Sequence, residues 1–177
     1  MPVDSKPDRL LFVTRLILTF LIWFTLAAAI ACTLLIPIAI FKHGAVVRDL
    51  AGSGIQAGAL PWMVLLLLLG IAMAVLGFFF FRLLRRIVDS VGEGDPFVPV
   101  NADRLRAMGW LSLGLQGVIV AATPLMLWFD ALPQKPNVHQ GDSGFSIGAL
   151  VTALLLFVLA RVFRVGSQMR EELEGTV

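Results

Sequence analysis

The chain has 177 residues, of which 58% are hydrophobic, with a mean hydropathy of +0.89 and a net charge of +2. Soluble domains have an apolar share of about half, so this composition excludes an ordinary soluble protein and predicts an integral membrane protein. The basic residues stand at the borders of apolar runs, and we therefore expect no direct binding to nucleic acid.

Four charge-free runs are each long enough to cross a bilayer once, because about 20 apolar residues span its core as a helix. The second run opens with AGSGIQAG, which is typical of a loop, so its helix is expected to start after that segment. The sequence thus predicts an all-α integral membrane four-helix bundle over 16–160. Its helices are expected at about 16–41, 60–81, 107–129 and 143–160.

The N-terminal segment carries basic residues before an apolar stretch, as a signal peptide does. That stretch continues through TLLIPIAIF, which is too long for the hydrophobic region of a cleaved signal. We therefore expect an uncleaved first span. Cys32 is the single cysteine, so it forms no intrachain disulfide, and we expect it to pack at bilayer depth.

Small residues at helical spacing indicate where helices approach closely, because packing in lipid depends on contact between backbones. Gly144, Gly148 and Thr152 form such a stripe on the fourth helix. We expect this stripe to pack against the other helices, with a homodimer as its alternative use. Similar stripes are Ala27 and Ala31 on the first helix and Gly70, Ala74 and Gly77 on the second.

No Asp, Glu, Lys, Arg or His lies inside the expected hydrophobic cores. Proton relays, ion pathways and many transport sites need such groups despite the cost of placing them in a membrane. The sequence therefore disfavours a pump or an ion-coupled transporter, and small-molecule transport is the third candidate function. Pro37 and Pro124 are expected to bend their helices, and Gln116 to make an interhelical hydrogen bond.

Orientation follows from the basic residues, because Lys and Arg in short loops resist translocation. Eleven of the 14 basic residues lie in or beside 1–15, 82–106 and 161–177. We therefore expect both termini and the loop 82–106 in the cytoplasm of a bacterium, the protein in its inner membrane, and the loops with His43 and His139 outside. The basic residues on the outer side are Lys42, Arg48 and Lys135. The expected interfacial anchors are Trp62 and Trp128 outside and Trp110 inside.

Catalytic motifs are missing from the sequence, which has no paired-Cys motif, GxSxG, Walker sequence or HExxH. We therefore expect no enzyme activity, no catalytic residue and no cofactor. His43 and His139 would form a metal site with an outer-loop carboxylate only if those loops folded together. We expect both histidines to be solvated and no metal to be bound.

The connector 82–106 is charged and interrupted by Gly and Pro. Its first arginines are expected to extend the second helix, and the Gly and Pro residues to end it. The segment PFVPV is expected to be extended, and Asn101 to cap the third helix. Phe97 is apolar within a polar connector, so it either docks back on the bundle or faces a partner.

The C-terminal segment 161–177 is expected to continue the fourth helix out of the membrane. Arginines at the lipid border are followed by an acidic tip, a pattern suited to an anionic membrane surface, and this tip could receive a basic partner. Because this segment and 82–106 are expected on the same side, we expect them to form one docking face.

Two blocks, GDPFVPVNADRLRAMGW and LARVFRVGSQMREELEGTV, resemble a bacterial family of small four-span membrane proteins catalogued as domain of unknown function 2975. The resemblance covers nearly the whole chain. Members are often encoded beside a small helix-turn-helix regulator of the Xre type, so the resemblance implies such a regulator as a partner. No catalytic residue is carried over. The matching residues are Pro96, Phe97, Asn101, Arg104, Leu105, Arg106, Gly109, Phe163, Arg164, Gly166, Arg170, Glu172 and Thr176.

Two functional hypotheses follow. The first is a non-enzymatic regulatory or scaffold protein of the inner membrane, which docks a cytoplasmic DNA-binding regulator and removes it from DNA. The second is an accessory subunit of a larger membrane complex. The candidate docking residues are Pro96, Phe97, Asn101, Arg104, Arg106, Phe163, Arg164, Arg170 and Glu172.

Overall fold

The structure is a computed structural model that describes residues 9–41, 60–130 and 144–174. These residues form four long helices, and each is apolar and long enough to cross a membrane. The all-α class and the four candidate spans are therefore as expected, and they imply a lipid bilayer around the chain. The helices are α1 (Arg9–Phe41), α3 (Leu60–Gly92), α4 (Pro99–Asp130) and α5 (Ile147–Glu174).

All four helices are longer than a bilayer core requires, at 33 residues for α1 and α3, 32 for α4 and 28 for α5. The extra turns lie largely in the segments that the sequence placed outside the membrane. The connector 82–106 is mostly helical, and only residues 93–98 lie between α3 and α4. Pro37 and Pro124 lie inside α1 and α4, and both helices continue through them.

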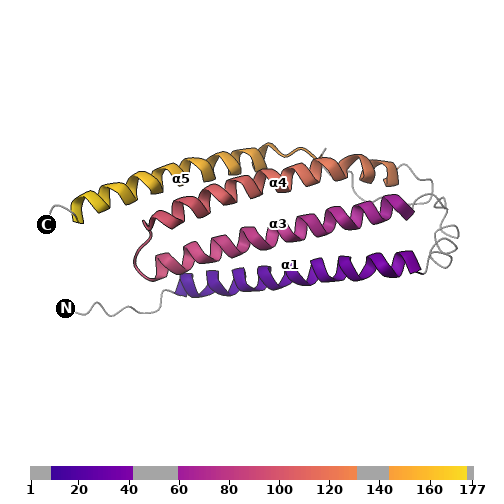
Figure 1. The fold of residues 1–177 in the computed structure, drawn as a ribbon, viewed down its shortest axis with the longest axis horizontal. Helices are drawn as coiled ribbons and strands as arrows, with labels where there is room; N and C mark the ends of the chain where they lie inside the picture. Colours follow the sequence, from indigo (N-terminus) through magenta and orange to yellow (C-terminus); the bar gives the residue numbers. More distant parts are fainter. Residues whose placement is uncertain (1–8, 42–59, 131–143, 175–177) are drawn as a thin grey trace.

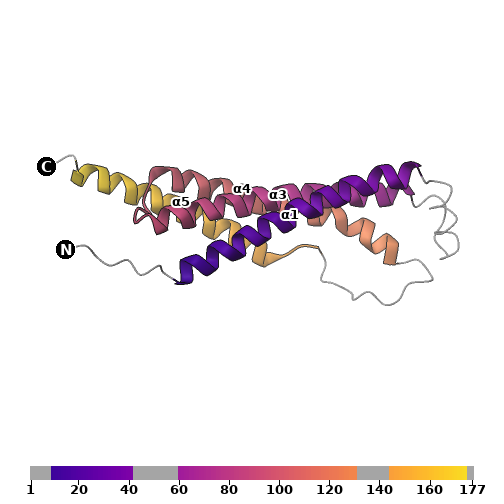
Figure 2. The same ribbon diagram turned by 90° about the horizontal axis from the view of Figure 1, so that it is seen from below.

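The helices lie side by side in chain order as an open row (Figure 1). α3 packs against α1 on one side and α4 on the other, while α5 packs against α4. α1 and α5 form the two edges of the row. The view from below shows that the helices cross obliquely, so the row is twisted (Figure 2). The four helices of the expected bundle thus form an open row.

Apolar side chains cover the outer surface of the edge helix α1. Phe20, Trp23 and Phe24 are all largely exposed, and Leu18 and Ala39 are the buried residues of this helix. A helix that is hydrophobic all round is typical of a membrane span, where lipid covers the faces that protein does not. The exposed apolar surface therefore agrees with the four candidate spans.

Small residues bring α1 and α3 close together, as expected for the stripe on α3. A Cβ atom added at Gly70 would lie 3.6 Å from Cys32 Sγ, and one at Gly77 would lie 3.5 Å from Thr25 Cγ2. Ala74, between the two glycines, is buried. Cys32 is half-buried in this interface and has the packing role that the sequence predicts.

Of the stripe expected on the fourth helix, only Gly144 lies against a neighbouring helix. α5 begins at Ile147, so Gly144 lies before it, and Gly148 and Thr152 are exposed. The buried small residues of α5 are instead Ala153 and Ala160. Helical spacing identified a stripe of small residues, but another face of the helix is buried. A homodimer through the exposed stripe stays a prediction.

Gln116 on α4 is buried, and its Nε2 atom donates a hydrogen bond of 2.7 Å to the Gly144 carbonyl oxygen. The expected interhelical bond therefore joins α4 to the segment that precedes α5. A side chain at Gly144 would collide with Thr123, so glycine allows this segment to lie against α4.

Candidate functional site

Every lysine and arginine within the described ranges 9–41, 60–130 and 144–174 lies at one end of the row. This arginine-rich end comprises the start of α1, the end of α3, the start of α4 and the end of α5 (Figure 1). The turn between α3 and α4 lies here, and α5 extends beyond it in both ribbon views. The arginines are Arg9, Arg15, Arg82, Arg85, Arg86, Arg104, Arg106, Arg161, Arg164 and Arg170.

A tight turn through residues 93–98 joins α3 to α4. Gly94 has a φ angle of +85°, in the left-handed region that favours glycine, and its N–H donates a hydrogen bond back to the end of α3. Pro99 begins α4, where its fixed φ angle and missing N–H suit the first helical position. The expected extended conformation of PFVPV is wrong, because Pro96 and Phe97 form a turn before α4 starts.

Asn101 was expected to cap the third helix, but it lies inside the first turn of α4 and is 0% exposed. Its Nδ2 atom donates to Ser90 Oγ at 2.7 Å and to the Pro96 carbonyl oxygen at 2.9 Å. Its Oδ1 atom accepts from Arg104 Nη1 at 2.9 Å, and that nitrogen also donates to the Arg86 carbonyl oxygen at 3.1 Å. The Asn101 amide therefore joins the end of α3, the turn and the start of α4.

An apolar cluster lies against this polar network and joins three helices. Its buried members come from α3, α4 and α5, so the arginine-rich end has a packed core as well as surface charges. Partly buried side chains surround it. The buried members are Ile87, Leu105, Met108 and Ala160, and the surrounding residues are Phe80, Leu83, Leu84, Leu156 and Phe163.

Phe97 connects the turn to α5. Its ring centroid lies 5.2 Å from that of Phe163, with the planes tilted by 38°. A Cβ atom at Gly166 would lie 2.9 Å from the Phe97 ring, so the glycine on α5 makes room for the ring. Of the two expectations for Phe97, the structure shows that it docks back on its own chain, although 42% of the residue stays exposed.

Three ion pairs connect different segments around this core, and a fourth, Arg85–Asp89, lies within α3. One fixes α1 to α3, where Arg15 Nε lies 2.9 Å from Asp89 Oδ1. Two others fix α5, one to the start of α4 and one to the turn. These groups are about half exposed, and such pairs contribute about 0–1 kcal/mol each, so they align the segments more than they stabilise them. The pairs are Arg15–Asp89, Arg85–Asp89, Arg164–Asp103 and Arg170–Asp95.

The predicted docking residues thus fall into two groups. Pro96, Phe97 and Arg104 belong to the turn and its network, together with the fully buried Asn101, which has no surface to offer a partner. Opposite them on α5 lie Phe163, Arg164 and Arg170, and Glu172 is exposed near the tip. Arg106 lines a groove between α4 and α5, together with Arg164 of the second group.

Sequence reasoning missed Ser90 as a partner of Asn101, and it missed three connector carboxylates as partners of distant arginines. Asp89, Asp95 and Asp103 each pair with an arginine that is distant along the chain. The available signal was the number of acids: the connector 82–106 has four, and arginines lie on a segment expected on the same side of the membrane. Such a pattern favours ion pairs between segments as well as a charged surface.

Within 9–41, 60–130 and 144–174, no group of three or more His, Cys, Asp or Glu residues could hold a metal ion. His43 and His139 lie outside the described residues, as does Thr176. What the described part of this end offers chemically is a fixed surface of guanidinium, carboxylate and apolar groups.

Comparison with known proteins places these features in a family. The family model described as "Protein of unknown function (DUF2975)" matches residues 19–177. No curated protein and no solved structure matches the chain. The match covers three of the four helices fully and most of α1, and it confirms the resemblance of the two sequence blocks.

Proposed function

The chain belongs to the DUF2975 family, and we propose that it is a non-enzymatic regulatory protein of the bacterial inner membrane that docks a DNA-binding regulator on its arginine-rich end. The proposal places this end, with both termini, in the cytoplasm. The distribution of basic residues supports that orientation, because positively charged loops are retained on the cytoplasmic side.

The observation that carries the proposal is the fixed extension of α5. The helix passes the α3–α4 turn and is held there by the Phe97–Phe163 contact and by the Arg170–Asp95 pair. Segments that are distant in sequence thus form one ordered unit at the arginine-rich end. A unit of this kind suits recognition, since a partner that binds it does not have to order it first.

The chemistry of the α5 extension indicates what it would bind. Val165, Met169 and Leu173 lie on one helical face, where Met169 is 57% and Leu173 71% exposed. This apolar face continues among Arg164, Arg170 and Glu171, beyond the length that a bilayer core would cover. We therefore assign it to protein contact.

Exposed carboxylates accompany this face at the tip of α5, including Glu171 and Glu172. An acidic tip with an apolar face fits a partner with a basic surface, and the DNA-contacting surface of a helix-turn-helix protein is basic. Binding here would cover the surface that the regulator uses on DNA. The membrane protein would thus hold the regulator away from its operators, and a shift of the helices would release it.

Co-purification of the full chain in mild detergent tests the proposal. The wild type is expected to recover a small cytosolic DNA-binding protein, and a Met169→Ala, Glu171→Lys double variant should recover at least about tenfold less of it. Leu154→Ala, on an exposed part of α5 within the span, is the matched control and should retain the partner. Equal recovery by wild type and double variant, or recovery of membrane proteins alone, would contradict the proposal.

A second candidate function, an accessory subunit of a larger membrane complex, is favoured by the open row. Its edge helices offer apolar faces that another membrane subunit could cover. Lipid can cover the same faces, and in lipid there is little hydrophobic force between helices. We therefore place this function second.

A further inference from the structure

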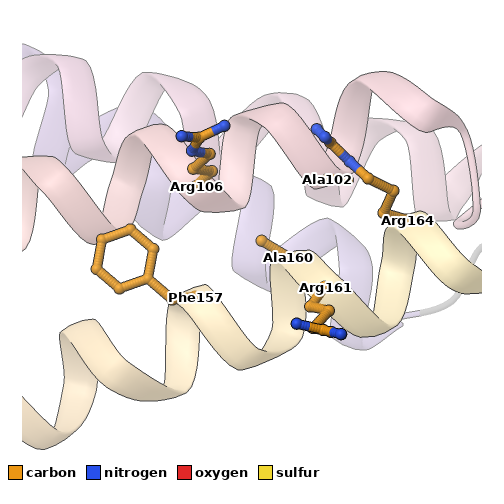
Figure 3. Close-up of a pocket in the computed structure, with 6 residues that line it drawn as sticks. All are labelled: Ala102, Arg106, Phe157, Ala160, Arg161 and Arg164. Atoms are coloured by element: carbon orange, nitrogen blue, oxygen red, sulfur yellow. The ribbon is translucent and has the colours of Figure 1, made fainter.

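The groove between α4 and α5 that Arg106 lines lies at the arginine-rich end, next to the Arg164–Asp103 pair (Figure 3). Its volume is about 330 Å³. Ala102 and Ala160 are both buried, and their small side chains leave the space between the helices open. The lining residues are Ala102 and Arg106 from α4, and Phe157, Ala160, Arg161 and Arg164 from α5.

The three arginines give the groove an excess of positive charge. Arg164 is paired with Asp103, but within the described residues the side chains of Arg106 and Arg161 have neither an ion pair nor a hydrogen bond. Figure 3 shows them on opposite helices, with the Arg106 side chain extending away from α5 and the Arg161 side chain extending away from α4. Guanidinium groups recognise phosphate through several N–H donors, so two of them flanking one groove suit a phosphate-bearing anion.

An aromatic wall adjoins the arginines. The Phe157 ring packs edge-on against Trp110, with centroids 5.4 Å apart, and a Cβ atom at Gly109 would lie 2.8 Å from the ring. Trp110 is largely exposed, as is common for tryptophan at a membrane interface. Along α5, Arg161 follows Phe157 by about 6 Å, at about 1.5 Å per residue. The groove is therefore aromatic on its membrane side and cationic one turn further out.

We propose that this groove binds the headgroup of an anionic phospholipid, with the Arg106 and Arg161 side chains turning over the groove to hold the phosphate and the upper acyl chain lying along Phe157 and Trp110. A free phosphate compound offers the same anionic group. The lipid is the better match because the aromatic wall would have no role for a small polar anion, and because basic pockets between spans are suited to anionic headgroups. The inference does not rest on the proposed docking of a regulator.

Native mass spectrometry of the full chain in detergent tests the site, with phosphatidylglycerol, phosphatidylcholine and glycerol 3-phosphate as probes. Wild type is expected to bind phosphatidylglycerol in preference to phosphatidylcholine, and an Arg106→Gln, Arg161→Gln variant should bind phosphatidylglycerol at least about tenfold more weakly. The matched control is Arg9→Gln, Arg86→Gln, which removes the same charge from exposed positions at the same end outside the groove.

The control should bind phosphatidylglycerol within about twofold of the wild type, because its changes leave the groove intact. Equal weakening in both variants would show binding by diffuse surface charge and would overturn the proposal, as would unchanged binding in the groove variant. Glycerol 3-phosphate that binds as tightly as the lipid would overturn the choice of a lipid. As a second measurement, phosphatidylglycerol should raise the Tm of wild type and control more than that of the groove variant.

Discussion

Asn101 is a fully buried polar side chain whose amide makes hydrogen bonds with donors and acceptors from three segments. Burying an amide is favourable only when its hydrogen bonds are made, and here both ends of the amide are engaged. This residue belongs to the family-like sequence block, so its place in that block has a physical reason: it holds the end of α3, the turn and the start of α4 in one arrangement. Contact with a partner is not required to explain it.

Replacing Asn101 by Ala tests this role. The change leaves Ser90 Oγ and the Pro96 carbonyl oxygen without their buried donor, so we expect the free energy of unfolding to fall by about 2 kcal/mol. The loss of the helical circular dichroism signal on heating in detergent measures the effect. Asp103→Ala, which removes an exposed ion pair, is the control and should cost less than about 1 kcal/mol. Equal effects of both changes would assign Asn101 no special role.

At the scale of elements, the arrangement of α3, α4 and α5 depends on the tight turn through residues 93–98 and on the contacts that this turn makes. Gly94 sets the direction of the chain, Pro99 starts α4, and Phe97 reaches α5 beside Gly166. The turn therefore decides two things at once: the antiparallel pairing of α3 with α4, and the place at which α5 is held.

Gly94→Ala should destabilise the protein by about 1 kcal/mol, because an added Cβ meets no atom within 4 Å and the whole cost comes from the left-handed backbone. The matched control is Gly117→Ala in the interior of α4, where the added Cβ also meets open space but the backbone is helical. There the same methyl group should stabilise by up to about 1 kcal/mol. Thermal unfolding of both variants in one detergent measures the sign of each change in the free energy of unfolding. Two changes of the same sign would contradict this account.

The sequence predicted those features that depend on residues close together along the chain. Apolar runs located the four helices, and the small residues Gly70, Ala74 and Gly77 located the face of α3 that meets α1. The start of α4 was placed too late, because Asn101 was interpreted as a cap although Pro99 already satisfies the first turn. The position of Phe97 could not be decided locally, since it depends on a glycine on a helix that is distant in sequence.

At the scale of the whole molecule, the order in which the four helices pack could not be predicted, because the composition of a span does not specify its neighbours. A helix that is apolar all round shows no preferred face in its sequence, and packing in lipid depends on shape rather than on hydrophobicity. The resulting open row has α1 and α5 at its edges. The side chains of its candidate docking surface come from α4, α5 and the turn between α3 and α4. Which of them contact one another depends on how these helices are arranged.

Photo-crosslinking in native membranes tests which surfaces of the row meet protein. A benzophenone amino acid in place of Met169 on the α5 extension should capture a soluble protein, because that face is assigned to protein contact. The same amino acid in place of Phe20 on α1 should capture lipid alone, since its outer face is expected to be covered by lipid. A membrane protein captured at Phe20, with nothing captured at Met169, would instead favour an accessory subunit.

The continuity of α5 has a mechanical consequence. It runs from Ile147 to Glu174 without a proline, whereas α1 and α4 each contain one. A helix without a proline is expected to transmit tilt and rotation along its length. A change in bilayer thickness or lateral pressure that tilts the N-terminal part of α5 is therefore expected to move its C-terminal tip as well. The ion pairs to Asp95 and Asp103 hold α5 beside the turn and the start of α4. Exposed pairs of this kind are weak, so they can break and re-form when α5 shifts.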